Sequence, residues 1–304
     1  MKSNVLGSPI KTIIGFTLFT ALLWISNVAL AATHNIHLSA ETLPNGQHGY
    51  KMLSHTSSEG STPTYPNEAT IPGPTVFVKQ GDVLNVTLTN NTPLNVGLSP
   101  GSIEAKPGDT QSFTYTANEV GTIAYHDKDS HLVGLFGALV VDNADGSVDN
   151  FIDEIGSIVA TKRADLDKEF VMFMIGSTFW GAEIANGNQI PLWTNPTLGA
   201  AKDDIVRFHV LSLGPGHTWH LHAHRWPDKA STSIIDVKLL KDISDSHSFT
   251  IKAGAGVGTG YWQYHCHLFS HMEAGMAGKF HVVAAGESAN SIAGASPSGS
   301  IFLN

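Results

Sequence analysis

Positive charge and cysteine are both scarce in this sequence. The chain has 17 Lys and Arg residues against 26 Asp and Glu residues, a formal net charge of −9, which argues against a nucleic-acid-binding protein. One cysteine among 304 residues excludes a disulfide within the chain. Charged residues make up only 14% and hydrophobic residues 42%. That composition is typical of a folded protein and excludes a disordered one.

Long helical patterns are also absent. After the first 31 residues, no segment keeps a 3.6-residue hydrophobic period over three turns. Short alternating or β-branched runs, separated by Gly, Pro, Asn and Asp, predict an all-β protein of sandwich type. The predicted strands are 75–79, 83–88, 112–116, 135–141, 170–174, 205–211, 246–251 and 277–283.

The chain contains an internal repeat. The segment 72–75 leading to 81–86 resembles 195–197 leading to 203–208, and Tyr125-His126 recurs as Tyr264-His265. Two homologous sandwiches therefore follow one another. We expect a first domain over 32–150, a second over 151–285 with the join in the acidic stretch 142–154, and a flexible tail over 286–304.

The N-terminus has the pattern of an export signal. Lys2 and Lys11 precede and flank an uncharged apolar run over 13–25, and Ala29-Leu30-Ala31 has the small-x-small form of a cleavage site. We expect a signal peptide over 1–31 and export to the periplasm, the extracellular space or the outer face of the membrane. An uncleaved anchor over 12–32 is the alternative, because that segment is long enough to span a bilayer.

Histidine is abundant, with 16 residues against 17 Lys and Arg, and this points to metal binding. A blue copper site needs one thiolate, two imidazoles and a weak thioether ligand. One set of residues in the second half supplies all four, namely His217, Cys266, His271 and Met276.

Strand alternation predicts a second copper locus behind the first. Successive side chains on a strand point to opposite faces, so His265 and His267 face away from Cys266. The same period puts His220 and His222 on one face. Zinc is the other metal considered, but a lone cysteine among histidines beside a methionine suits copper better than the multi-cysteine zinc patterns.

The remaining histidines have weaker interpretations. We expect His224 to lie on the surface. Four further histidines precede the first predicted sandwich, and we expect most of them to be solvated, although together they could bind metal weakly: His34, His37, His48 and His55.

The residues from 214 to 283, above all His217-Thr218-Trp219-His220-Leu221-His222 and Tyr264-His265-Cys266-His267, resemble the multicopper oxidases, specifically the two-domain small laccases. The resemblance implies two cupredoxin-like Greek-key β-sandwich domains. It also implies a type 1 copper from which Cys266 and the adjacent His265 and His267 pass electrons to a copper cluster that reduces dioxygen. The donor would be a small phenol, a metal ion or a redox protein, and the assembly a homotrimer in which neighbouring subunits share each cluster.

The first domain departs from the family pattern. Small laccases have two His-x-His pairs there, but the segment 94–98 contains no histidine, and the second pair reads His126-Asp127-Lys128. His126 alone remains as a metal ligand, unless His131, or His34 and His37, substitute. Asp127 stands where the second domain has Cys266, so no blue copper is expected in the first domain.

These observations leave an exported oxidase with an altered cluster as the main hypothesis. A non-enzymatic blue-copper electron carrier or copper-binding protein is the alternative. A copper nitrite reductase is a minor one, since that family places its blue copper in the first domain and lacks the His-Cys-His triplet.

Overall fold

The computed structural model describes residues 31–295 except 61, 215 and 230–232. The predicted leader up to residue 30, and the part of the predicted tail beyond 295, lie outside the described residues. No helix within the described ranges is long and apolar enough to cross a membrane.

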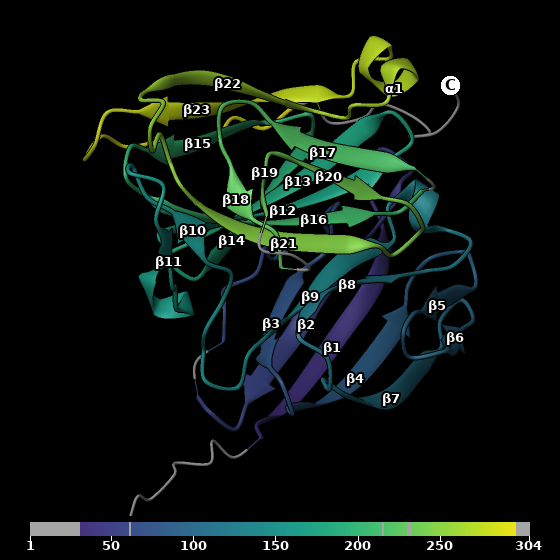
Figure 1. Ribbon diagram of the computed structural model, residues 1–304. Coiled ribbons are helices and arrows are strands. Elements are labelled where there is room, and N and C mark those ends of the chain that lie inside the picture. The colour runs from purple at the N-terminus through teal and green to yellow at the C-terminus, as the bar shows by residue number, and fades with distance from the viewer. Residues whose placement is uncertain (1–30, 61, 215, 230–232, 296–304) are drawn as a thin grey trace, which may run out of the picture. The chain divides into compact units, whose positions relative to one another are not determined.

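The first half of the chain forms two facing sheets and a small hairpin (Figure 1). Alternation in the strands positions its core, as where Leu84, Val86 and Leu88 are buried and Asn85 is exposed. One sheet has the order β2 (His48–Ser57), β1 (Thr33–Thr42), β4 (Val83–Asn90) and β7 (Thr110–Thr116), the other β3 (Thr75–Lys79), β9 (Phe136–Asp142) and β8 (Gly121–His126), and the hairpin joins β5 (Val96–Leu98) to β6 (Ile103–Ala105).

The second half forms two five-stranded sheets around a core rich in aromatic side chains, with a stack of Phe208 on Phe249. One sheet has the order β14 (Asn188–Thr194), β13 (Thr178–Ala185), β12 (Lys168–Ile175), β16 (Ile205–Ser212) and β21 (Ser246–Lys252), the other β15 (Thr197–Ala201), β23 (Ala277–Val283), β22 (Gly260–His265), β17 (His217–Leu221) and β20 (Val237–Leu240). The short elements are β10 (Phe151–Ile152), β11 (Ile158–Val159), β18 (Trp226–Pro227), β19 (Ile234–Ile235), the helix α1 (Phe269–Glu273) and 3-10 turns at His131–Val133 and Arg163–Asp165.

The two halves repeat the same strand pairing. β4 is parallel to β1 and antiparallel to β7, as β16 is parallel to β12 and antiparallel to β21. β9 is likewise parallel to β3 and antiparallel to β8, as β23 is to β15 and β22. Each of the eight predicted strands overlaps an observed one, so the predicted all-β fold is confirmed.

Two expectations about the ends of the fold were wrong. The histidines at 34, 37, 48 and 55 do not precede the first sandwich but belong to β1 and β2, and His34 and His48 are buried. Residues 286–295 of the predicted flexible tail run along the second sandwich, where Thr197 and Ile292 exchange backbone hydrogen bonds. Small polar residues suggested mobility, but backbone groups at the edge of β15 offered them partners.

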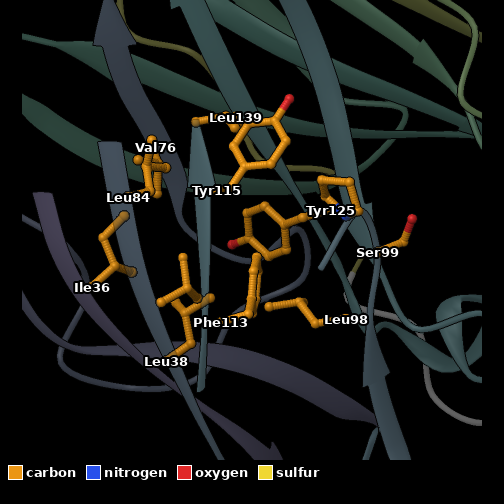
Figure 2. Close-up of a pocket in the computed structure, with 12 residues that line it drawn as sticks. Ile36, Leu38, Val76, Leu84, Leu98, Ser99, Phe113, Tyr115, Tyr125 and Leu139 are labelled. Atoms are coloured by element: carbon orange, nitrogen blue, oxygen red, sulfur yellow. The ribbon is translucent and has the colours of Figure 1, made fainter. Parts of the chain in front are cut away.

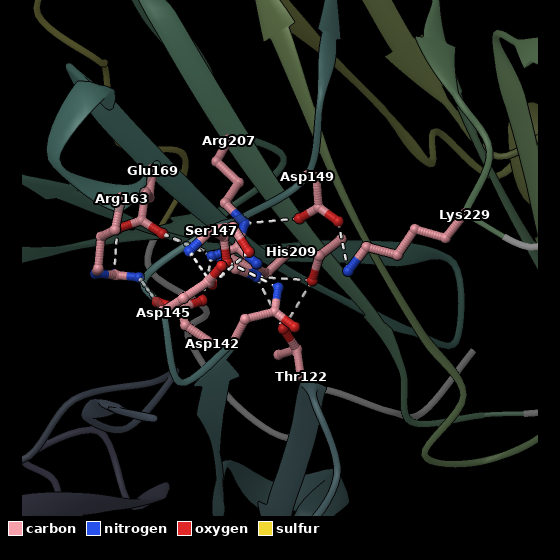
Figure 3. Close-up of polar contacts among 12 residues, drawn as sticks. Thr122, Asp142, Asp145, Ser147, Asp149, Arg163, Glu169, Arg207, His209 and Lys229 are labelled. Carbon is pink, nitrogen blue, oxygen red and sulfur yellow. Dashed lines mark hydrogen bonds and ion pairs between the residues drawn. The ribbon is translucent and has the colours of Figure 1, made fainter. Parts of the chain in front are cut away.

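A third apolar cluster lies between the sandwiches, with Phe136 from β9 packed on Phe173 from β12 and Trp180 from β13. A buried polar network borders it (Figure 3). Arg207 is 1% exposed and contacts Asp142 and Asp149 at 2.6 and 2.8 Å. Buried charges are costly unless paired, so this network ties the end of β9 and the following segment to β16.

His209 lies inside the same network. Its Nε2 is 3.0 Å from Glu169 Oε2, and its Nδ1 contacts the hydroxyls of Thr122 and Ser248. Burial, followed by the positive charge of Arg207, lowers the pKa of His209 from 6.5 to about 4. The imidazole is therefore neutral at pH 7.

This histidine predicts a loss of stability on mild acidification. Below pH 6.5 the His209 side chain binds a proton in the unfolded chain but not in the folded chain, which excludes this proton until about pH 4. The stability of the folded state that depends on neutral His209 is therefore fully present above pH 6.5 and is lost as the pH falls through this window. We expect His209 to lower the free energy of unfolding by about 3 kcal/mol across this window, because one unit of pKa difference corresponds to about 1.4 kcal/mol. Urea unfolding at several pH values, with a chelator present throughout, measures it. His209→Gln should make the pH dependence less steep by that amount, and an unchanged profile in that variant would contradict the assignment.

Candidate metal centre

Three predicted ligands of the thiolate site lie together in the second sandwich. Cys266 directly follows β22, His217 begins β17, and His271 lies on α1. Their ligand atoms are all within 4.8 Å of one another, and Cys266 Sγ is 3.6 Å from His271 Nδ1. Met276 is fully buried near them, and its carbonyl accepts a hydrogen bond from the Cys266 amide at 3.2 Å.

The chemistry of this group fits a copper ion. His217 Nδ1 is buried and has no hydrogen-bond partner within the described part of the chain, an arrangement that a metal bond would satisfy. Burial and then the neighbouring His271 lower the pKa of His217 to about 4, so its imidazole is neutral and able to act as a ligand at pH 7. Cys266 is 0% exposed, which protects a free thiol from solvent.

Thr218 is a site residue that the sequence analysis did not find. Its amide nitrogen and hydroxyl lie 3.5 and 3.6 Å from Cys266 Sγ, and its hydroxyl oxygen accepts a hydrogen bond from the His267 amide at 2.5 Å. Hydrogen bonds to a ligating sulfur tune a metal site. Only the pairing of β17 with β22 brings Thr218 to this position, so no spacing in the sequence could indicate it.

A group of four imidazoles lies on the other side of the Cys266 backbone. The ligand atoms of His220, His265 and His267 are within 4.8 Å of one another, and His222 Nε2 is 3.0 Å from His265 Nε2. His220 and His265 are cross-strand partners on β17 and β22. Burial lowers the pKa of both, with that of His220 at about 4. His222 and His267 are exposed, so the group opens onto the surface.

The first sandwich repeats the backbone of this site without its ligands. Tyr125 Oη donates to the Pro74 carbonyl as Tyr264 Oη donates to that of Pro196. His126 Nδ1 contacts the next residue's carbonyl at 3.1 Å, as His265 Nδ1 does at 3.0 Å. The bridge between Ser99 and His126 matches the pairing of His220 with His265, so a serine stands where the second sandwich has its cluster histidine.

Asp127 stands at the position that Cys266 has in the second sandwich, and it has a structural role. Its carboxylate accepts hydrogen bonds from the amides of Gly97, Asp129 and Ser130, which uses both oxygens. Lys128 is exposed. The apolar cavity in this sandwich, shown in Figure 2, is lined by side chains such as Leu84, Phe113 and Tyr125 and by no histidine, cysteine or carboxylate among the described residues.

His126 does not join the four imidazoles within one chain. In the described structure its Nε2 lies 3.4 Å from Ser244 Oγ, and its ring is 5.4 Å from that of His131. His131 Nδ1 contacts the carbonyls of Asp127 and Lys128. Both rings therefore hold Nδ1 against backbone oxygen and keep Nε2 as the nitrogen for a ligand, the orientation expected of metal-binding histidines.

The expectation that His224 lies on the surface was wrong. This side chain is 2% exposed, its Nδ1 contacts the His222 carbonyl, and its Nε2 accepts a hydrogen bond from the Gly254 amide at 3.1 Å. The strand alternation ends at Ala223, whose φ of 65° turns the chain and sends the next side chain inward.

The chain is similar to known copper proteins. Residues 242–286 match the multicopper oxidase family model. A probable nitrite reductase-hydroxylamine oxidoreductase fusion protein of Kuenenia stuttgartiensis is 32% identical over 251 residues, covering 70% of this chain and 28% of that protein. A laccase of Aspergillus fumigatus is 26% identical over 177 residues, covering 50% of this chain and 28% of that protein. The chain thus spans less than a third of the length of either relative.

Structural similarity supports the fold. The structure of a copper nitrite reductase from Nitrosomonas europaea superimposes with a TM-score of 0.55 at 16% identity, covering 83% of this chain and 94% of that one. The family model covers the segment that carries Cys266 and its neighbouring histidines, and two sandwiches with a repeated strand order surround it. The chain is thus similar to multicopper oxidases and copper nitrite reductases, and the match to the multicopper oxidase family model lies over the segment that carries Cys266.

Proposed function

We propose that this protein is an exported copper oxidoreductase that oxidises its donor by one electron at the thiolate site and couples this to dioxygen reduction at an altered imidazole site. The observation that carries the proposal is the position of Cys266, whose thiol belongs to one ligand group while its chain neighbours His265 and His267 belong to the other. His217, Cys266, His271 and Met276 would hold one copper ion, and the four imidazoles would hold copper behind it. Bound copper would supply one-electron redox chemistry that protein side chains lack.

The chain's own residues provide the connection and the entrance. One peptide bond joins Cys266 to each of its neighbours, His265 and His267. Thr218 contacts the Cys266 sulfur and the His267 amide. On the outer side, α1 and the preceding Leu268 present apolar side chains beside His271, among them Phe269, which is 67% exposed, and Met272. An apolar surface at this position favours an uncharged aromatic donor or an apolar protein surface over a hydrated metal ion.

The altered first sandwich predicts fewer than four copper ions per chain. Five imidazoles, from His126 and the four in the second sandwich, remain for a cluster that normally uses eight, and His131 would add a sixth. We expect weak oxidase turnover with phenolic donors and fast one-electron exchange at the thiolate site. Copper quantitation after full reconstitution, together with oxygen consumption, tests this expectation in the wild type, His126→Ala and His131→Ala.

His281→Gln is the matched control, because that ring stacks on Tyr261 away from both ligand groups. Loss of copper and oxygen uptake in the two alanine variants, but not in the control, supports the oxidase. One copper per chain with no oxygen uptake would establish the electron carrier, which the serine at position 99 and the exposed Lys128 favour. Nitrite consumption without oxygen uptake would instead indicate a reductase.

We also expect a homotrimer. The four imidazoles open onto the surface, while His126 lies apart from them in the same chain, so a shared site needs a first sandwich from another subunit. A ring of head-to-tail subunits satisfies that requirement. Light scattering on the copper-loaded protein measures the mass in solution, and a monomer with both ligand groups loaded would contradict a shared site.

A further inference from the structure

A buried carboxylate lies at the start of the first sandwich, far from the metal ligands in the sequence. Asp82, in the turn between β3 and β4, is 2% exposed. Its Oδ1 accepts a hydrogen bond from the Ala32 amide at 2.7 Å, and its Oδ2 accepts one from the Lys79 amide at 2.7 Å. His34 Nε2 lies 3.2 Å from Oδ2. The carboxylate is thus well supplied with donors.

His34 is connected in turn to two further polar side chains. Tyr65 Oη lies 2.9 Å from His55 Nδ1, and His55 Nε2 lies 3.0 Å from His34 Nδ1. Burial raises the pKa of Tyr65, and burial together with His34 lowers that of His55 to about 4. Tyr65 therefore donates to a neutral His55, which contacts His34, and His34 Nε2 in turn contacts the carboxylate.

No lysine or arginine in the described part of the chain forms an ion pair with the Asp82 carboxylate. His34 is the only basic side chain within ion-pair distance of Asp82 there, and the Lys79 ammonium pairs with Glu59 at 2.9 Å. Buried carboxylates are normally paired with a cation. A cation other than His34 has one available source, because Ala32 follows the small-x-small motif and its nitrogen already lies 2.7 Å from Asp82 Oδ1.

We propose that the chain is cleaved between Ala31 and Ala32 and that the new α-ammonium group of Ala32 forms a buried ion pair with Asp82. A protease that cleaves after small residues behind an apolar segment would catalyse the step, in which water adds across the amide, the carboxylate stays on Ala31 and the ammonium on Ala32. Ala31 is exposed whereas Ala32 is 1% exposed. The Ala32 carbonyl also accepts a hydrogen bond from the Val83 amide at 2.9 Å, which holds the new terminus in place.

The internal repeat supplies a comparison. Asp204 matches Asp82 in sequence and likewise accepts a hydrogen bond from the amide three residues earlier, Ala201, at 2.8 Å. That carboxylate is only half-buried. The turn itself therefore requires no buried carboxylate, and the burial of Asp82 is specific to the chain's N-terminal strand. Cleavage changes the donor from a neutral amide into an ammonium group, so the hydrogen bond to the carboxylate becomes an ion pair.

Three measurements test the proposal, and none depends on copper. The mass of the full chain after export should correspond to a protein that begins at Ala32, and a retained leader or another terminus would overturn the proposal. The α-amine of that protein should react slowly with an acylating reagent, faster in Asp82→Asn, and unchanged in the matched control Asp204→Asn. Equal reactivity in all three proteins would also overturn it.

The third measurement avoids any substitution in the turn. A chain that begins at Ala31 keeps the Ala32 amide but displaces the positive charge by one residue. Its equilibrium constant for unfolding should be roughly tenfold larger than that of the chain beginning at Ala32, because the buried carboxylate interacts more strongly with an ammonium group than with a neutral amide. Equal stability of the two chains would show that Asp82 does not bind the ammonium group.

Discussion

Replacing Arg207 by leucine is expected to lower the free energy of unfolding by about 3–5 kcal/mol. Arg207 is buried between the two sandwiches, and its removal leaves Asp142 and Asp149 without their closest shared cation. Breaking a buried pair on one side costs more than the pair itself contributes, because the remaining charges stay in a medium of low dielectric constant. Urea unfolding at pH 7 measures the difference.

A surface lysine provides the control for this prediction. Lys252 pairs with Glu154 and Asp203, but both partners are about 40% exposed. Lys252→Met should change stability by less than about 1 kcal/mol, as surface pairs typically do. If Arg207→Leu cost no more than Lys252→Met, the polar network would not hold the sandwiches together.

Replacing Cys266 by serine is expected to abolish the blue absorption of the copper-loaded protein and its electron exchange with a donor. The colour of this class of site arises from the bond between thiolate and cupric ion, and serine offers no thiolate. Cys266 is the only cysteine in the chain, so no other residue can replace it. Absorption spectroscopy with copper quantitation measures both effects.

Thr218→Val is the companion variant for the cysteine site. It removes the hydroxyl 3.6 Å from Cys266 Sγ but leaves the thiol and the amide in place. We expect the blue colour to persist and the reduction potential to change, because hydrogen bonds to the sulfur tune the site. A blue Cys266→Ser protein would contradict the ligand assignment, while a colourless Thr218→Val protein would show that the hydroxyl is needed to build the site.

Much of the fold follows from local patterns. Strands such as 75–79 and 277–283 were predicted from β-branched residues between turn residues. The structure has strands with the same limits. The strands β1 and β2 were not among the predicted ones, although Ile36, Leu38 and Ala40 alternate with polar residues in β1. His34 is buried there through its partners Asp82 and His55, which lie far from it in the sequence.

The sequence by itself predicted the ligand types and their division into two groups, while the loss of ligands from the first sandwich was what the resemblance to small laccases implied. The first two predictions need only residue identity and the two-residue period of strands, and the third also needs the family pattern. The tertiary structure decided that Thr218 contacts Cys266, that His224 is buried, that Asp127 binds backbone amides and that Asp82 lies beside Ala32. Each of these contacts depends on strand pairing or on a backbone turn, and a linear pattern holds no information about the distance between residues that only folding brings together.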